Sequence, residues 1–239
     1  VVEVQFGESG EYEIRNQVQG INHRMGIFVE EVTKLGSIHV SQTISESSHH
    51  HIFEELRTNS SVVEDIEQYR HLFGQTPDHN LTLTLQIDSL APAIEQSMLF
   101  DRAFFNPVEW TGTMPRMNWA TDTDQIEWIL QDTDSDSKNM EIGWRFKLGE
   151  VVKIRIHNDA KAFHAMQHPL HIHGQRFLVL EQDGKINENL VWKDTVLLPT
   201  GSTTDILLEL SNPGYWMVHC HIAEHLESGM KFVFYVEEE

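Results

Sequence analysis

Cysteine is almost absent from this chain of 239 residues, which contains one, at position 220. A single cysteine excludes an internal disulfide framework and leaves the redox compartment open. Basic residues are also scarce: 17 Lys and Arg stand against 37 Asp and Glu, for a formal net charge of −20. This charge argues against binding to nucleic-acid phosphates or to an anionic membrane surface, because like charges repel. It favours cationic substrates or metal ions only weakly.

Long apolar runs are missing as well. No stretch approaches the roughly 18 consecutive apolar residues of a transmembrane helix, so none is predicted. No signal peptide is visible at the N-terminus, and the chain opens on VVEVQF, which reads as the inside of a strand. We therefore expect a fragment or a processed product. About 40% of the residues are hydrophobic, which is enough for a sizeable core in one β domain, or in one domain with part of another.

The order of predicted elements indicates three segments. Residues 1–43 contain short strand-like runs (VVEVQF, YEIRNQV and SIHVSQ), too few to close a sandwich, so we interpret them as the C-terminal strands of a preceding β domain. Residues 44–79 form a polar linker with one helix near residues 60–73, because Ser61 and Glu64 make a capping box ahead of an apolar stripe. Residues 80–239 are predicted to form one all-β domain, a sandwich or barrel. Its predicted strands include LTLTLQI, QIEWILQ, WRFKL, VVKIRIHN, RFLVLEQ, LVWKDTVLL, TDILLEL, GYWMVHCH and KFVFYVE.

The segment VHCHIAEHLESGM, residues 218–230, contains the cysteine, three histidines and a methionine. Successive side chains of a strand point to opposite faces, so His219 and His221 share one face and Cys220 points to the other. These three side chains cannot bind one metal ion within a regular strand, but they can serve two sites. His225 and Met230 follow the strand, where a loop can fold back towards Cys220.

A second cluster, QHPLHIHG, spans residues 167–174. His171 and His173 are two residues apart and share a face, whereas the odd offset of His168 directs it to the opposite side. The proline after His168 favours an extended backbone there. If the two strands are neighbours, each side of the pair presents four potential ligands. One set is His171, His173, His219 and His221, and the other is His168, Cys220, His225 and Met230.

The set that contains Cys220 has the composition of an electron-transfer copper site. Two imidazoles, a thiolate and a weak axial thioether are the ligands of blue copper, whereas zinc prefers four strong ligands. The imidazole set suits copper, zinc or iron and does not choose among them. A copper-bound Cys220 would be joined through the backbone to His219 and His221, a short route for electrons. Each residue alone is more often a core or surface residue, but the spacing of all eight together favours metal sites.

The two motifs resemble the C-terminal copper signature of multicopper oxidases, H-P-x-H-x-H followed by H-C-H-x-x-x-H-x-x-x-x-M. The chain is similar to the laccase-like and bacterial copper-oxidase branch, and the segments NWATDTDQIEW, GQRFLVL, WKDTV and NPGYWMVHCHIAEH fit it. The resemblance implies a cupredoxin-like Greek-key β-sandwich over residues 80–239. It also implies that residues 1–43 are the closing strands of a second cupredoxin domain.

Carried over by position, the resemblance implies a role for each motif residue. The implied ligands of type 1 copper are His168, Cys220 and His225 with Met230 axial, that of type 2 copper is His171, and those of type 3 copper are His173, His219 and His221. His225 is expected to face the electron donor and, with Cys220, to form the catalytic pair. Asp194, in WKDTV, is a candidate acceptor that orients a histidine.

In such enzymes type 1 copper takes electrons singly from a reducing substrate, and a trinuclear copper cluster reduces dioxygen to two waters. That cluster needs two further H-x-H motifs from an N-terminal domain, and no segment matches them; His49 and His51 have the spacing but stand in the polar linker. The chain is therefore expected to hold the type 1 site and half of the trinuclear site, and to be inactive alone. Its expected partners are an N-terminal cupredoxin domain of the same parent protein or a partner chain, a phenolic, aromatic-amine or metal-ion donor, and dioxygen.

A stand-alone cupredoxin that shuttles electrons without oxygen chemistry is the alternative. It would use the type 1 set and leave the other four histidines without a role. The resemblance also implies a periplasmic or extracellular location. The residues alone name neither the donor, nor the reduction potential, nor the oligomeric state.

Overall fold

The computed structural model describes residues 4–22, 27–43, 60–93, 96, 125–163 and 165–238. The linker histidines His49 and His51 lie outside the described residues. By contacts the chain divides into two compact units, with the main boundary between residues 65 and 66. Each unit is described by itself.

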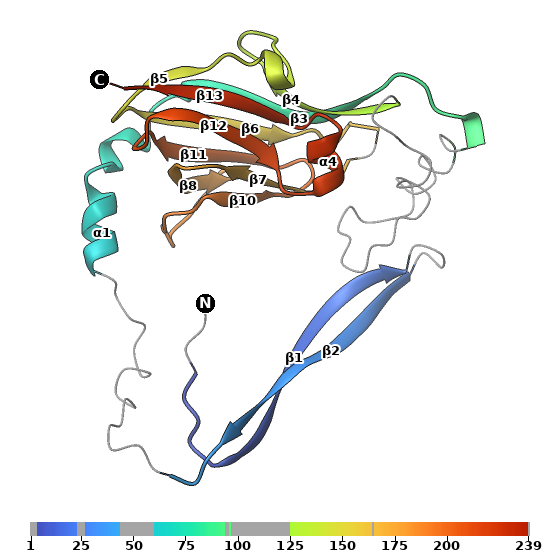
Figure 1. The fold of residues 1–239 in the computed structure, drawn as a ribbon, viewed down its shortest axis with the longest axis vertical. Helices are drawn as coiled ribbons and strands as arrows, with labels where there is room; N and C mark the ends of the chain where they lie inside the picture. Colours follow the sequence, from blue (N-terminus) through green and yellow to red (C-terminus); the bar gives the residue numbers. More distant parts are fainter. Residues whose placement is uncertain are drawn as a thin grey trace. The chain divides into compact units, whose positions relative to one another are not determined.

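The first unit is built on a long antiparallel hairpin of β1 (Gly10–Asn22) and β2 (Ile27–Val40), shown in blue in Figure 1. Its register runs from Gly10 opposite Val40 to Asn22 opposite Ile27, with one irregularity after Ile14. The run YEIRNQV falls in β1, and residues 37–40 of the run SIHVSQ fall in β2, which ends at Val40. A strand over VVEVQF is wrong for residues 4–6, because no described strand pairs with them. The assignment of residues 1–43 to a preceding cupredoxin domain stays a prediction.

The expected linker helix is present and changes type near its end. The α-helix α1 covers Ser60–Glu67, and a 3₁₀ turn, η2, follows at Arg70–Leu72. Ile66 of the predicted apolar stripe is buried, and the turn ends before Gly74. No helix in the described part of the chain is long and apolar enough to cross a membrane.

The described residues of the second unit form two sheets that pack face to face (Figure 1). The larger sheet has the order β4-β3-β6-β11-β8-β9, and the smaller has the order β10-β7-β12-β13-β5. The strands of the larger sheet are β3 (His79–Ile87), β4 (Ile126–Asp132), β6 (Val151–Asn158), β8 (Arg176–Gln182), β9 (Lys185–Ile186) and β11 (Thr203–Glu209). Those of the smaller sheet are β5 (Arg145–Lys147), β7 (His168–Ile172), β10 (Thr195–Leu198), β12 (Gly214–Cys220) and β13 (Lys231–Glu237).

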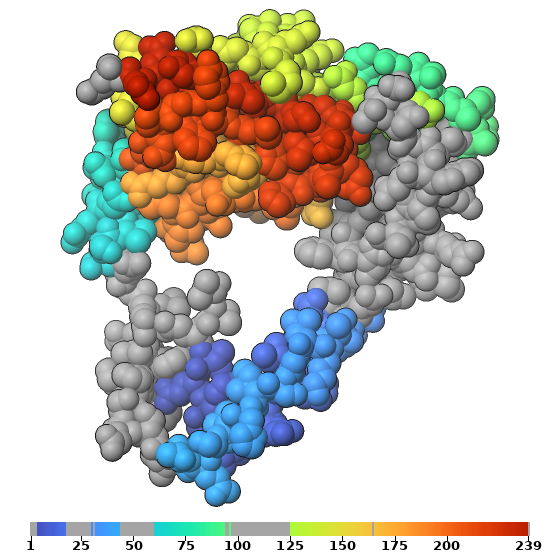
Figure 2. Space-filling model, viewed as in Figure 1, coloured from blue at the N-terminus to red at the C-terminus, as the bar shows by residue number. Residues whose placement is uncertain are grey.

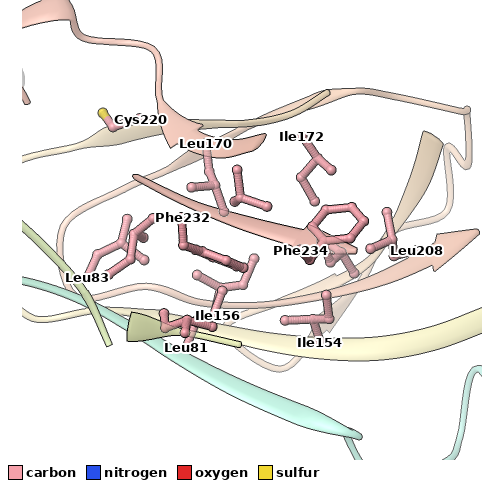
Figure 3. Close-up of a cluster of buried hydrophobic side chains, with 14 of the residues drawn as sticks. Leu81, Leu83, Ile154, Ile156, Leu170, Ile172, Leu208, Cys220, Phe232 and Phe234 are labelled. Carbon is pink, nitrogen blue, oxygen red and sulfur yellow. The ribbon is translucent and has the colours of Figure 1, made fainter. Parts of the chain in front are cut away.

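The core lies between the two sheets because one face of each strand is apolar. In β13, Phe232, Phe234 and Val236 alternate with more exposed residues and point inward. They pack with apolar side chains of β3, β6, β7 and β11 (Figure 3). Cys220 lies at the margin of this cluster, with its sulfur directed away from it (Figure 3). Figure 2 shows β12 and β13, in orange and red, as parts of one closely packed surface. The prediction of an all-β sandwich is confirmed.

One predicted strand is shorter than its apolar pattern. LVWKDTVLL gives only β10, because the chain changes sheets within this run. Lys193 pairs with Phe177 of β8 in the larger sheet, and two residues later Thr195 pairs with His171 of β7 in the smaller one. Sequence alternation cannot show this change of partner. The two-residue strand β9, which follows the turn at Asp183 and Gly184, was not predicted.

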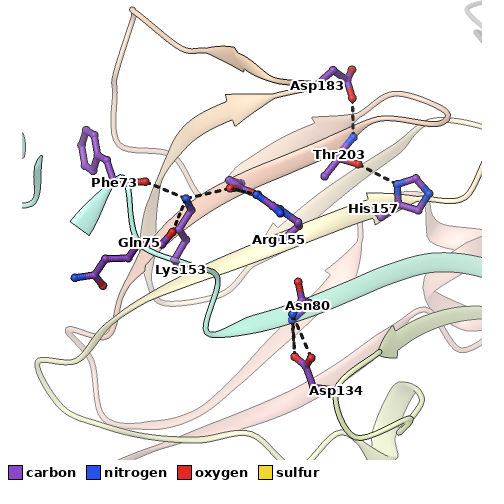
Figure 4. Close-up of polar contacts among 10 residues, drawn as sticks. Phe73, Gln75, Asn80, Asp134, Lys153, Arg155, His157, Asp183 and Thr203 are labelled. Atoms are coloured by element: carbon purple, nitrogen blue, oxygen red, sulfur yellow. Dashed lines mark hydrogen bonds and ion pairs between the residues drawn. The ribbon is translucent and has the colours of Figure 1, made fainter. Parts of the chain in front are cut away.

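An ion-pair network around the buried Asp205 joins β6, β11 and the segment after η2 (Figure 4). Asp205 is 2% exposed and accepts hydrogen bonds from Arg155 Nε and Nη2 at 2.7 and 2.8 Å. Lys153 Nζ lies 3.1 Å from the same carboxylate and also donates to the carbonyl oxygens of Phe73 and Gln75. Burial alone would raise the pKa of Asp205, but the hydrogen bonds from Arg155 and Lys153 outweigh it and hold this pKa below its ordinary value.

Candidate metal centre

Two neighbouring strands carry most of the predicted ligands. β7 and β12 are antiparallel, with His171 opposite His219 and Leu170 opposite Cys220, so the strands that hold the two motifs do pair. His168 and Cys220 are buried at 2% and 0% exposure, next to the core. Because side chains alternate along a strand, His171 and His219 point to the other face of the pair.

On the inner side, His168, Cys220 and His225 bring their ligand atoms together. Cys220 Sγ lies 3.7 Å from His168 Nδ1 and 3.5 Å from His225 Nδ1, and the two Nδ1 atoms are 3.2 Å apart. A metal ion with bonds of about 2.0 Å to nitrogen and about 2.3 Å to sulfur spaces its ligand atoms roughly 3.3–3.7 Å apart. The three donors are therefore placed to fit one metal ion.

The chain after β12 turns back towards Cys220, as the spacing predicts. His225 lies in the short helix α4 (Ala223–Glu227). The Met230 N–H donates to the carbonyl of His225 at 2.9 Å, and the Cys220 N–H donates to the carbonyl of Met230 at 3.1 Å. Met230 is fully buried. Its thioether is a poor ligand for zinc but an ordinary axial donor in blue-copper sites, so the donor set fits copper better than zinc.

Burial controls the protonation of the thiol. It raises the pKa of Cys220 to about 12, and the hydrogen bond from the Ile222 backbone opposes this only partly. The thiol therefore keeps its proton at neutral pH until a metal ion displaces it. Metal binding at this group must release a proton.

On the other face of β7 and β12, ligand atoms of His171, His173 and His219 converge. The Nε2 atoms of His173 and His219 are 3.0 Å apart. His221 is exposed, and its ring centroid lies 5.6 Å from that of His171 and 5.7 Å from that of His219. Three of the four predicted imidazoles thus form the converging group, and the fourth lies beside it.

Hydrogen bonds fix which ring nitrogen carries the proton in His171 and His219. His171 Nδ1 donates to the backbone carbonyl of Asp194 at 2.9 Å and lies 2.9 Å from Thr195 Oγ1. His219 Nδ1 donates to the backbone carbonyl of Cys220 at 2.8 Å. Each ring therefore leaves its Nε2 lone pair for a metal ion. Asp194 does orient a histidine, but through its main chain; its carboxylate accepts from the Thr195 hydroxyl.

The surroundings of His173 and His219 favour the uncharged form of these two imidazoles. Burial lowers the pKa of His173, and the neighbouring His171, His219 and His221 lower it further. Burial also lowers the pKa of His219, more than its bond to the Cys220 carbonyl raises it. Neutral imidazoles are the form that binds metal ions.

Two residues contact the predicted ligands although the sequence patterns did not predict these contacts. Thr195 was hidden in a strand-like run, and Trp128 stacks on His225 with ring centroids 3.6 Å apart. The apolar pattern of QIEWILQ predicts that Trp128 is in a strand. It does not reveal which side chain meets the indole, because that depends on pairing between segments almost a hundred residues apart.

A β-sandwich with a buried His–Cys–His–Met set beside a cluster of imidazoles is a type 1 copper-like protein of the cupredoxin class. The multicopper oxidase family profile matches residues 102–239 of this chain. Because this match covers more than half of the sequence, the chain belongs to the multicopper oxidase family.

A solved structure supports the fold. The multicopper oxidase from Campylobacter jejuni, described as a metallo-oxidase, aligns over 98% of this chain and 42% of its own, with 16% identity and a TM-score of 0.57. At this identity the likeness concerns the fold alone, and it confirms the expected cupredoxin-like sandwich.

Curated relatives match the chain over shorter stretches. An iron transport multicopper oxidase of Schizosaccharomyces pombe is 33% identical over 127 residues, which are 44% of this chain and 20% of the relative. An L-ascorbate oxidase of Cucurbita pepo is 35% identical over 118 residues, or 43% of this chain and 21% of the relative. Laccase-24 of Oryza sativa is 43% identical over 81 residues, or 29% and 14%. These matches span about a fifth or less of each relative's length.

Proposed function

We propose that this chain is the C-terminal portion of a copper-dependent oxidase, in which it carries the type 1 site and half of the ligands of a trinuclear site. The observation that carries the proposal is the convergence of His168, Cys220 and His225 within one buried group. A second group of imidazoles on the other face of the same strands supports it. The donor sets suit copper, as argued above.

Bound copper would supply one-electron redox chemistry at the type 1 site and reduction of dioxygen to water at the trinuclear site. His168, Cys220 and His225 would hold type 1 copper with Met230 in the axial position. His171 would bind type 2 copper. The proposed type 3 ligands are His173, His219 and His221.

The chain's own residues connect the two groups. Cys220 and His219 are consecutive, and the His219 ring is hydrogen-bonded to the Cys220 carbonyl. This gives a covalent path and a hydrogen-bonded path from the thiol to an imidazole of the second group. Exclusion of solvent around Cys220 keeps its sulfur from competing reactions.

The remaining parts of the proposal rest on the family. We propose a phenolic, aromatic-amine or metal-ion electron donor, with His225 as the ligand nearest to it. An N-terminal cupredoxin domain of the same parent protein, or a partner chain, would provide the other histidines of the trinuclear site. The chain alone would then be inactive, and the parent protein would act in the periplasm or outside the cell.

The first experiment is the visible absorption spectrum of the purified chain after addition of copper(II). We expect an intense blue thiolate-to-copper band in the wild type and no such band in Cys220→Ser. The control His71→Gln alters an exposed histidine that is far in sequence from the proposed ligands, and its band should be unchanged. A colourless wild-type product would contradict the proposed type 1 site.

The oxidase part of the proposal has a separate test. We expect the parent gene to encode two H-x-H motifs upstream of residue 1, and the parent protein to consume dioxygen in the presence of a reducing donor. A blue chain from a parent without these motifs would instead indicate an electron carrier.

A further inference from the structure

A tryptophan from the opposite sheet lies against both imidazoles of the type 1 group. Trp128 belongs to β4 in the larger sheet, whereas His168 lies in the smaller one. Its ring is stacked on His225, with centroids 3.6 Å apart and planes 21° apart. It meets the ring of His168 edge-on, at 5.3 Å and 68°. Both Trp128 and His225 are buried, so one indole covers ring surface of two proposed ligands.

The backbone of Trp128 is hydrogen-bonded to the segment between β12 and β13. This segment, residues 221–230, carries His225 and Met230 and is called the ligand loop. β4 is an edge strand, whose free backbone groups need partners. The Trp128 N–H donates to the carbonyl of Ser228 at 2.9 Å, and Ser228 stands between His225 and Met230. The same residue therefore supports the ligand loop through its backbone and one ligand ring through its side chain.

Asn139 holds the backbone of β4 in place next to Trp128 through two side-chain hydrogen bonds. Its amide nitrogen donates to the Trp128 carbonyl at 3.1 Å, and its amide oxygen accepts from the Leu130 N–H at 2.8 Å. At Gly229 the backbone has a φ of 112°, and a Cβ there would lie 3.0 Å from Asn139 Nδ2 and 3.1 Å from the Trp128 carbonyl. The ligand loop passes this close to β4 only because residue 229 has no side chain.

We infer that Trp128 is a positioning residue of the type 1 site. Its indole holds the His225 imidazole in the plane in which Nδ1 faces Cys220 Sγ, and it keeps water from that ring face. The reason is that the second side-chain torsion of histidine is broad, so an unstacked imidazole samples many orientations. The inference rests on the proposed type 1 function and goes beyond it, because Trp128 is not a ligand.

The chain offers a matched control for ordinary core packing. Trp144 is buried in the same core, packs edge-on against Phe232 at 5.0 Å and donates a hydrogen bond to Asp132. None of its ring contacts among the described residues is with a proposed ligand. Loss of either tryptophan removes a large buried ring, but only Trp128 touches the type 1 group.

The test compares copper binding in the full 239-residue chain and in Trp128→Leu, Trp128→Phe and Trp144→Leu. The measurements are the copper hyperfine splitting by EPR, the position of the blue band and the copper affinity by chelator competition. We expect Trp128→Leu to bind copper about 10- to 100-fold more weakly, as is typical when a group that orients a ligand is lost, and to alter the EPR spectrum. Trp128→Phe should stay close to the wild type in both, and Trp144→Leu should lose stability but keep the affinity and spectrum.

Two outcomes separate this inference from the proposed function. A blue wild type with an unchanged spectrum and affinity in Trp128→Leu would overturn the positioning role and leave the type 1 site intact. A wild type without the blue band would overturn both. If Trp128→Leu does not fold, Trp128→Ile replaces the flat ring with a β-branched side chain that suits a strand, and equality of Trp128→Ile with Trp128→Phe would overturn the inference.

Discussion

At the scale of single residues, Cys220 determines how the two groups of ligands are connected. Its side chain joins the buried group, while the side chain of the preceding His219 joins the group on the other face of the strand pair. This division follows from strand geometry, because neighbouring side chains point in opposite directions. A one-residue shift of β12 against β7 would exchange the two faces and separate both groups.

Met230 carries a prediction at this scale. Even a weak thioether donor stabilises Cu(II), so removal of the sulfur should favour Cu(I). We expect Met230→Leu to raise the reduction potential of the copper-loaded chain, with only a small cost in stability because the two side chains have similar volumes. Spectroelectrochemical titration of the blue band measures the change. Met166→Leu, at another buried methionine of the core, is the control; an unchanged or lower potential in Met230→Leu would contradict the axial role.

At the scale of elements, the fold keeps β6, β11 and the segment after η2 in place through a charged network as well as through the core. Asp205 in β11 balances Lys153 and Arg155 of β6, and Lys153 reaches the carbonyls of Phe73 and Gln75. Removal of one partner from such a buried pair leaves an uncompensated charge. The network therefore supports the pairing of β6 with β11 only while all of its charged partners are present.

This network predicts a pH dependence of stability. The folded pKa of Asp205 lies below its ordinary value of 3.8, so its stabilisation is complete above about pH 4 and is lost as the pH falls through the folded pKa. We expect Asp205→Asn to lower the free energy of unfolding by about 3 kcal/mol at pH 7. This gap in the free energy of unfolding between wild type and variant should narrow below about pH 4.

Urea denaturation of the metal-free chain from pH 7 to pH 3 measures this gap. Asp88→Asn changes an exposed aspartate and serves as the control, with little expected effect at any of these pH values. A gap that stays constant across the range would show that Asp205 acts through packing rather than through its charge.

At the scale of the whole molecule, the type 1 group links segments that are far apart in the sequence. Its proposed ligands come from β7, β12, α4 and the residues directly after α4, and the supporting Trp128 comes from the opposite sheet. These donors are not close together in an unfolded chain, so copper should bind mainly to the folded state. Its binding energy then adds to the stability of the sandwich.

Copper removal should therefore destabilise the protein. At a free copper concentration about 100 times Kd, we expect the free energy of unfolding to increase by about 2.7 kcal/mol and Tm to rise by roughly 5–10 °C. A chelator should reverse both changes. Scanning calorimetry with and without copper(II) measures the shift. Cys220→Ser should lose most of the copper-induced rise in Tm. An equal rise in the wild type and in Cys220→Ser would indicate that copper acts at another site.

The sequence by itself determined the all-β class, most strands of the second unit and which residues are candidates for the two sets of ligands. These features depend on local patterns: alternation of side chains, histidines two residues apart, and a proline after His168. The helix near residues 60–73 was also predictable from its apolar stripe, although α1 begins at Ser60, so Ser61 lies inside the helix rather than at its N-cap. Such signals are set within a few residues by backbone geometry and therefore remain visible without a structure.

Only the tertiary structure decided which partners the strands choose. It places Lys193 against one sheet and Thr195 in the other, directs the main chain of Asp194 to His171, and stacks Trp128 on His225. Each of these contacts joins residues from separate segments, and many other pairings satisfy the same local alternation. They are selected by the simultaneous packing of both sheets around one core, a property of the whole chain rather than of any short stretch.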